Sequence, residues 1–259
     1  MVIGLDKFRE AMSPYADCFV IIGGTACDNI LSGSPMRPRA TDDIDVILIV
    51  EKLTHEFIEA FWDFIKAGGY KNGKRKRSED KSPAYELYRF KEPDEGYPVQ
   101  IELLSRHSDI LGEPSGFHIE PIPVDEDQYS LSAIMMDEDY YVFTVSHSFV
   151  DGGLRFASAE ALICLKAKAY LNLLKEKNEG RQVNTKGIKK HRSDVLKLAA
   201  IGSFPEKVTV PASIFEAVQE FIRTINDQLP DVGLEASLKR DKKDILSFLD
   251  NLNNLFEIK

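Results

Sequence analysis

The chain has 259 residues, of which 43% are hydrophobic and 29% are charged, a composition typical of a globular protein with a sizeable core. Its formal net charge of −9 argues against bulk electrostatic attachment to nucleic acid, although a local basic site is compatible with it. No apolar run is long enough for a transmembrane helix, and no signal peptide is expected at the N-terminus. Three cysteines without metal-ligand spacing favour a reduced, cytoplasmic protein without structural zinc.

The first elements expected along the chain are a helix, a strand and a second helix. Residues 5–13 predict a short helix, and the apolar run over 18–22 predicts a buried strand. Gly23 and Gly24 then predict a tight turn, after which a helix is expected over 25–31. This order places a glycine turn between a buried strand and the start of a helix.

Further strands and one amphipathic helix are expected in the remainder of the first half. Residues 44–50 predict a second buried strand, and apolar side chains at helical spacing predict a helix over 54–67. The Lys-rich segment over 71–81 is expected to be a loop. Beyond it we expect three strands, over 85–90, 98–104 and 140–145, of which the first two pair with each other.

The second half of the chain is predicted to be helical, with helices over 158–176, 188–200, 212–228 and 241–256. Because strands give way to helices near residue 157, we predict a domain boundary there. The expected fold class is α+β, with a mixed sheet flanked by helices over residues 1–157 and a helical domain over 158–259.

The pair Asp43 and Asp45 enters the second predicted strand with one apolar residue between them. Because side chains alternate along a strand, both carboxylates are expected on the same face. Two negative charges that close are costly unless a cation lies between them, and Mg²⁺ prefers carboxylate and phosphate oxygens. The alternative is a solvated loop, where Asp-x-Asp is also common.

Two further features suggest a site for phosphate and metal near Asp43 and Asp45. The turn Gly23-Gly24-Thr25 allows a close backbone approach to a phosphate, and the following helix offers free N–H groups, although a Gly-Gly turn often has no further role. Glu102 stands among apolar residues in a predicted strand. On an inward face it would join the two aspartates as a third acid, and on an edge strand it would face solvent.

Three segments carry a resemblance to a known family, and they read IIGGTACDNIL, RPRATDDIDVILIV and VQIELLS. They resemble the nucleotidyltransferase superfamily built on the DNA polymerase β palm, and most closely the AbiEii/AbiGii toxin type. The resemblance covers most of residues 19–200. It implies that Asp43, Asp45 and Glu102 bind Mg²⁺ or Mn²⁺ and carry catalysis, and that the nucleoside triphosphate is contacted by Gly23, Gly24, Thr25 and Arg39. Arg39 can equally be a solvated loop residue.

The resemblance extends to two signatures in the helical half. Lys166, in the segment AEALICLKAKA, matches a lysine that is expected to face the triphosphate, and Lys168 competes for this role. Asp194, in the segment KKHRSDV, matches an acid of the nucleotide site, with Arg192 or Lys190 as possible substrate contacts. The alternatives are an ordinary solvated helix lysine and an ordinary helix N-cap.

The resemblance implies a Mg²⁺-dependent enzyme that moves NMP from an NTP to an acceptor. For the toxin branch the implied acceptor is RNA, such as a tRNA end, or a protein, and an antitoxin partner is expected. Two alternatives stay open. The acidity of the chain suits an enzyme that modifies a cationic antibiotic, and the fold also suits a nucleotide-binding module without turnover.

Overall fold

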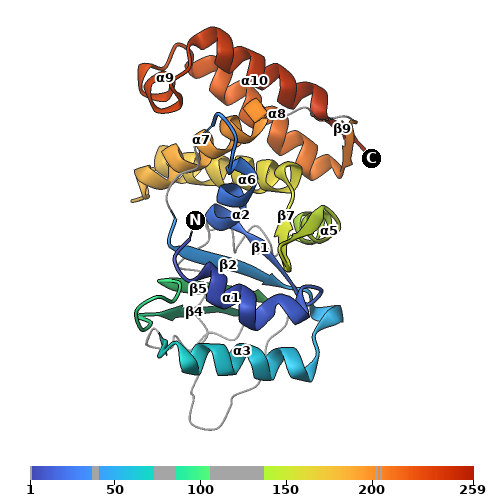
Figure 1. Cartoon of the computed structure of the whole chain (residues 1–259). Coiled ribbons are helices and arrows are strands. Elements are labelled where there is room, and N and C mark those ends of the chain that lie inside the picture. The colour runs from blue at the N-terminus through green and yellow to red at the C-terminus, as the bar shows by residue number, and fades with distance from the viewer. Residues whose placement is uncertain (1, 37–40, 73–85, 106–136, 202–203, 205) are drawn as a thin grey trace. The chain divides into compact units, whose positions relative to one another are not determined.

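The computed structural model describes residues 2–36, 41–72, 86–105, 137–201, 204 and 206–259 (Figure 1). The chain divides into two compact units. The first comprises Met1–Asn29, Arg39–Gln128 and Ser148–Ser158. The second comprises Ile30–Pro38, Tyr129–His147 and Ala159–Lys259. The two units therefore interleave along the chain, and a division into two domains at residue 157 stays a prediction.

In the described residues, the first unit is built on a mixed sheet of seven strands in the order β3-β4-β5-β2-β1-β7-β6. Two neighbouring pairs, β2–β5 and β1–β7, run parallel, and the others run antiparallel. The strands are β1 (Phe19–Ile22), β2 (Asp43–Leu48), β3 (Lys71–Asn72), β4 (Glu86–Lys91), β5 (Gln100–Ser105), β6 (Ser148–Asp151) and β7 (Leu154–Ala157). The α+β class is confirmed, as is the predicted pairing of β4 with β5.

Helices α1 (Leu5–Met12) and α3 (His55–Ala67) cover one face of this sheet. Aromatic side chains form the contact: the ring centroids of Phe8 and Phe19 lie 5.9 Å apart, and those of Phe61 and Phe90 lie 5.6 Å apart. Such pairs add to the free energy gained by burying the rings. Side chains alternate along each strand. The residues between those that pack against the two helices therefore point to the opposite face of the sheet.

The predicted strand over 140–145 is wrong, because these residues belong to helix α5 (Glu138–Ser146). The aromatic and β-branched residues of this run resemble a strand, but the burial pattern is helical. Tyr140, Tyr141, Phe143 and Thr144 are buried, whereas Val142 is 52% exposed. The N-cap signal comes one residue before the helix, where the Asp137 side chain accepts a hydrogen bond from the Asp139 N–H at 3.0 Å.

The hairpin of β6 and β7 was not predicted. Its two strands have four residues each and are joined at Gly152 and Gly153, whose φ angles are +55° and +84°. Glycines at two successive positive φ angles are typical of a tight hairpin turn. The Gly-Gly pair was therefore the one local signal for this hairpin in the sequence.

The second unit is mostly helical, as predicted. The four long helices expected there are present: α6 (Ala159–Asn178), α7 (Thr185–Ile201), α8 (Ala212–Gln228) and α10 (Lys242–Leu255). Helix α9 (Val232–Leu238) and the strand pair of β8 (Val208–Val210) with β9 (Phe256–Ile258) were not predicted. Among the described helices, none is long and apolar enough to cross a membrane.

Asp231 is the N-cap of α9 and connects this helix to Arg192 of α7. Its carboxylate accepts hydrogen bonds from the Leu234 N–H at 2.9 Å and from Arg192 Nη1 at 2.7 Å. Partial burial acts to raise the pKa of Asp231, but these hydrogen bonds and the charge of Arg192 outweigh it and hold the pKa below its ordinary value.

We expect Asp231→Ala to lower the free energy of unfolding at neutral pH by about 1 kcal/mol, as loss of an N-cap does. The pKa of Asp231 is lower in the folded state, so its stabilisation is present above the unfolded pKa and disappears as the pH falls through the folded pKa. Urea denaturation of the wild type and of Asp231→Ala, at a series of pH values from neutral to acidic, measures the difference in their free energies of unfolding. A difference between them that does not narrow at acidic pH would contradict the prediction.

Candidate functional site

The three acids predicted from the sequence lie on the same face of two adjacent strands of the first unit. Strand β2 lies beside β5 in the sheet (Figure 1). Asp45 of β2 is the register partner of Glu102 of β5, and Asp43 is the partner of Gln100. Register partners share a face of a sheet, and so do residues two apart on one strand. Asp43 and Asp45 are half-buried, whereas the intervening Ile44 is fully buried on the helix-covered face.

Glu102 does not face solvent on an edge strand, which was the alternative interpretation of this residue. Strand β5 lies between β4 and β2, and Glu102 is 9% exposed. Its Oε1 atom accepts hydrogen bonds from Arg89 Nε at 2.5 Å and from Gln100 Nε2 at 2.8 Å. The cation beside this carboxylate in the structure is therefore a guanidinium.

The chemistry of Asp43 and Asp45 suits a hard divalent cation, because both carboxylates leave the same strand face and are partly accessible. Glu102 is bonded to Arg89 in this structure, and its predicted role as a third metal ligand stays a prediction. Within the described residues, no three His, Cys, Asp or Glu side chains lie close enough together to hold a metal ion. The residues thus offer two ligands for Mg²⁺ or Mn²⁺ and a third acid that is held by Arg89 one strand away.

Gly23 packs directly against Asp45. A Cβ atom at this position would lie 1.9 Å from Asp45 Oδ2 and 2.9 Å from its Cγ, and the φ angle of Gly23 is +70°. Only glycine satisfies both conditions without strain. A turn at the two glycines, separate from the helix, was predicted. This prediction is wrong, because α2 (Gly23–Leu31) begins at Gly23 itself. The free N–H groups of its first turn therefore lie next to Asp45.

Thr25 connects the start of α2 to the start of β2 by a hydrogen bond. Its Oγ1 donates a hydrogen bond to the backbone carbonyl of Asp43 at 2.6 Å, and the residue is 1% exposed. The hydroxyl therefore supports the strand end that carries the aspartates. Its predicted contact with a nucleotide stays a prediction. Arg39 lies outside the described residues, and its predicted contact with the nucleotide stays a prediction.

We expect Gly23→Ala to reduce strongly the nucleotide transfer that the resemblance implies, because its methyl group would displace the Asp45 carboxylate. Gly33→Ala is the matched control: its φ angle is +80°, but a Cβ atom there would have no neighbour within 4 Å. Both variants incur the backbone cost of a positive φ, about 1–2 kcal/mol. Equal transfer rates and equal thermal midpoints in the two variants would contradict a steric dependence of Asp45 on Gly23.

Lys166 and Asp194 form a buried ion pair inside the second unit. Lys166 Nζ lies 2.8 Å from Asp194 Oδ2, and the two residues are 0% and 3% exposed. Lys166 is therefore not a solvated helix lysine. Asp194 lies in the interior of α7 and is not an N-cap. Lys168, the competing lysine, is partly exposed.

Arg192, considered as a substrate contact, bonds within the second unit. Its Nη1 atom donates to Asp231 at 2.7 Å and to Gln228 Oε1 at 3.2 Å, and its side chain is 12% exposed. Gln228 in turn accepts from the Tyr170 hydroxyl at 3.3 Å. In this structure Arg192 joins α7, α8 and the N-cap of α9.

Arg89 and Gln100, which donate hydrogen bonds to Glu102, were not predicted from the sequence to lie at the site. Arg89 stands between two aromatic residues in a strand that was predicted, and strand alternation places it on the face opposite Phe90. This alternation was the available signal. The partner of Arg89, however, depends on the register between β4 and β5, which the sequence did not specify.

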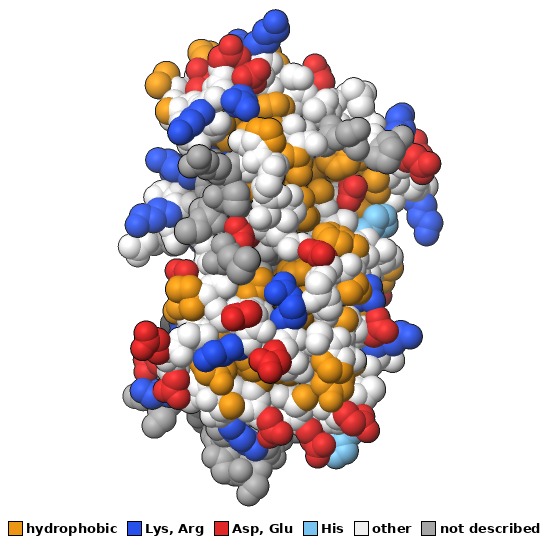
Figure 2. Space-filling view, in the orientation of Figure 1, with side chains coloured by type: hydrophobic (Ala, Val, Ile, Leu, Met, Phe, Trp, Pro, Cys, Tyr) orange, Lys and Arg blue, Asp and Glu red, His pale blue; other side chains and the backbone are white. Residues whose placement is uncertain are grey.

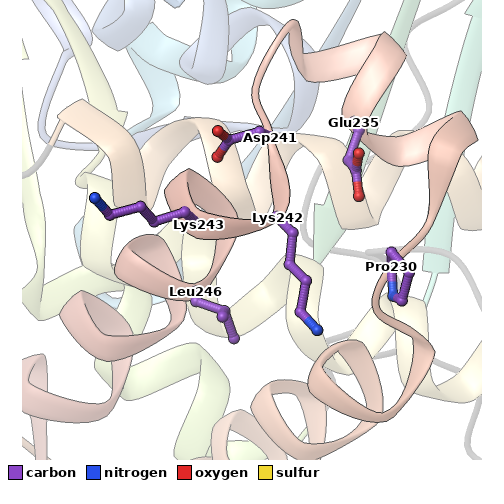
Figure 3. A pocket seen from close by; sticks show the side chains of 6 residues that line it. All are labelled: Pro230, Glu235, Asp241, Lys242, Lys243 and Leu246. Atoms are coloured by element: carbon purple, nitrogen blue, oxygen red, sulfur yellow. The ribbon is translucent and has the colours of Figure 1, made fainter.

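Acidic and basic side chains are interspersed over the face drawn in Figure 2. The second unit has an open hollow, shown in Figure 3. Its lining residues are Pro230, Glu235, Asp241, Lys242, Lys243 and Leu246.

Comparison with known proteins identifies the family. A family model described as nucleotidyl transferase AbiEii toxin, type IV TA system, matches residues 8–256. The match thus includes residues 201–256, beyond the segment that carried the resemblance. No curated protein matches the chain significantly. With the model spanning almost the whole sequence, the chain belongs to the AbiEii nucleotidyl transferase toxin family of type IV toxin–antitoxin systems.

Proposed function

We propose that the protein is a Mg²⁺-dependent nucleotidyltransferase that moves NMP from an NTP to RNA, such as a tRNA end, or to a protein. It would act in the cytoplasm as the toxin of a toxin–antitoxin pair. The observation that carries the proposal is the placement of Asp43, Asp45 and Glu102 on one sheet face beside the N-terminus of α2. Membership of the family supports it.

Asp43 and Asp45 would hold Mg²⁺, or Mn²⁺ in its place, and Glu102 is the third acid of the site. When bound, the cation neutralises charge on the triphosphate and on the leaving pyrophosphate. The N–H groups at Gly23, Gly24 and the following residues orient phosphate oxygens, because they have no partners within the helix. Glu102 accepts the proton of the attacking acceptor hydroxyl.

Arg39 and the pair of Lys166 with Asp194 complete the proposed nucleotide contacts. Lys166 would offset negative charge on the triphosphate. Its ammonium is buried against Asp194 in this structure, so contact with a nucleotide requires the ammonium to leave that carboxylate or to share it. Asp194 then has the role of holding the lysine in place until the nucleotide binds.

A second candidate function is nucleotide binding without turnover. The observation that favours it is the ion pair of Glu102 with Arg89, which occupies the third acid of the site. A protein that uses this acid only to stabilise its fold would bind an NTP at α2 and the two aspartates and would leave it intact.

An acceptor assay tests the proposal and separates these functions. Wild-type protein and Mg²⁺ are incubated with one α-phosphate-labelled NTP at a time, together with total RNA, a protein extract or an aminoglycoside. We expect label on RNA or protein for one or more NTPs, and none with the double variant Asp43→Asn, Asp45→Asn. Label on the aminoglycoside alone would identify a small-molecule enzyme. NTP binding without any transfer would identify a binding module.

A further inference from the structure

The Arg89 side chain on β4 lies on the sheet face that carries the three acids. Arg89 is the register partner of Glu102, which in turn is the partner of Asp45, so the three residues form a row across three strands. Its Nε atom lies 2.5 Å from Glu102 Oε1. The two side chains are 20% and 11% exposed, so solvent screens this pair much less than a surface pair.

Gln100 is a second donor to the same carboxylate oxygen. Its Nε2 atom lies 2.8 Å from Glu102 Oε1, and it belongs to the same strand, two residues earlier. Oε1 therefore receives one charged and one neutral hydrogen bond, from two strands. Two fixed donors restrict the rotamers of a long, flexible side chain, and charge-assisted hydrogen bonds are the stronger kind.

We infer that Arg89 and Gln100 are positioning residues for the reaction, which hold the Glu102 carboxylate beside Asp45 for the arriving acceptor hydroxyl. The inference rests on the proposed function. It explains how a third acid can lie next to Asp45 at low exposure, because Arg89 supplies the compensating charge within the sheet. It also gives β4 a part in the site.

Arginine is the side chain that this position requires. A guanidinium is planar and presents donors in a fixed geometry, whereas a lysine ammonium is a flexible point charge. We therefore expect Arg89→Lys to keep the charge but lose part of the orientation, and Arg89→Gln to lose both. The matched control is Lys91→Gln, because Lys91 lies two residues further along β4 on the same face and is exposed.

The test measures kcat and KM for transfer, the affinity for the NTP with Mg²⁺, and the thermal midpoint of each variant. We expect Arg89→Gln to lower kcat by about 10²-fold, the lower range for general base catalysis, with NTP affinity within a factor of about two. Arg89→Lys should fall between this variant and wild type, and Lys91→Gln should match wild type. A change in stability alone would leave kcat of the folded protein unchanged.

A double-variant cycle with Glu102→Gln shows whether Arg89 acts through Glu102. If it does, Arg89→Gln causes no further loss of kcat once Glu102 has been replaced, because the pair is then non-additive. Wild-type kcat in Arg89→Gln, or independent losses in the cycle, would overturn the inference while the proposed function stands. Absence of transfer by wild-type protein that binds NTP would overturn the proposed function itself, and this inference with it.

Discussion

Asp45→Asn is expected to abolish nucleotide transfer in a protein that remains folded. Removal of a single preorganised charge-stabilising group commonly costs about 10²–10³-fold in kcat, and we expect at least that loss here. Asp45 occupies the centre of the site, since it is the register partner of Glu102 and packs on Gly23. Asparagine has nearly the same shape, so the close fit to Gly23 is kept while the negative charge is lost.

The measurement is the initial rate of label transfer together with the thermal midpoint of each protein. Asp42→Asn is the matched control, because Asp42 precedes the same strand and its side chain is exposed. The control should transfer at the wild-type rate. Wild-type activity in Asp45→Asn would show that the negative charge of this side chain is not required, and the proposed metal site would have to lie elsewhere.

Loss of one partner of the buried pair Lys166–Asp194 is expected to have the largest effect on stability. With Lys166→Met or Asp194→Leu, the remaining charge is buried without its counterion, which typically costs about 3–5 kcal/mol. The double variant Lys166→Met, Asp194→Leu should recover most of this loss, because replacement of a whole buried ion pair by apolar side chains is often neutral. Urea denaturation measures the free energy of unfolding of all three variants.

The same variants distinguish a structural role of Lys166 from a role in nucleotide binding. A stable double variant that fails to transfer nucleotide, while Lys168→Met transfers normally, is the result we expect if Lys166 contacts the triphosphate. Transfer at the wild-type rate by the double variant would restrict the pair to a structural role. Single variants as stable as wild type would contradict the burial of the pair.

The sequence predicted the central strands and the shared face of the aspartates because both depend on local rules. The apolar run before Gly23 and the alternation around Asp43 and Asp45 specify strands and faces without knowledge of the rest of the chain. The bounds of α8, Ala212–Gln228, coincide with the prediction because its apolar stripe is unambiguous and Pro211 precedes it.

Other features depend on contacts between distant residues and could not be predicted. The pairing of Arg89 with Glu102 requires the register between two strands, and a slip of one residue would place Arg89 on the other face. The pairing of Lys166 with Asp194 spans 28 positions and depends on how α6 packs on α7. The run over 140–145 was ambiguous because aromatic and β-branched residues suit a buried strand as well as the buried side of a helix.

The most direct test of the account compares two labels in one reaction. Wild-type protein, Mg²⁺ and the acceptor are incubated with an NTP labelled either at the α-phosphate or at the γ-phosphate. If the protein transfers a nucleotide, the acceptor gains the α label and the γ label is released in pyrophosphate. With Asp45→Asn, we expect neither labelling of the acceptor nor release of pyrophosphate. Appearance of the γ label on the acceptor, or α labelling that persists in Asp45→Asn, would contradict the account.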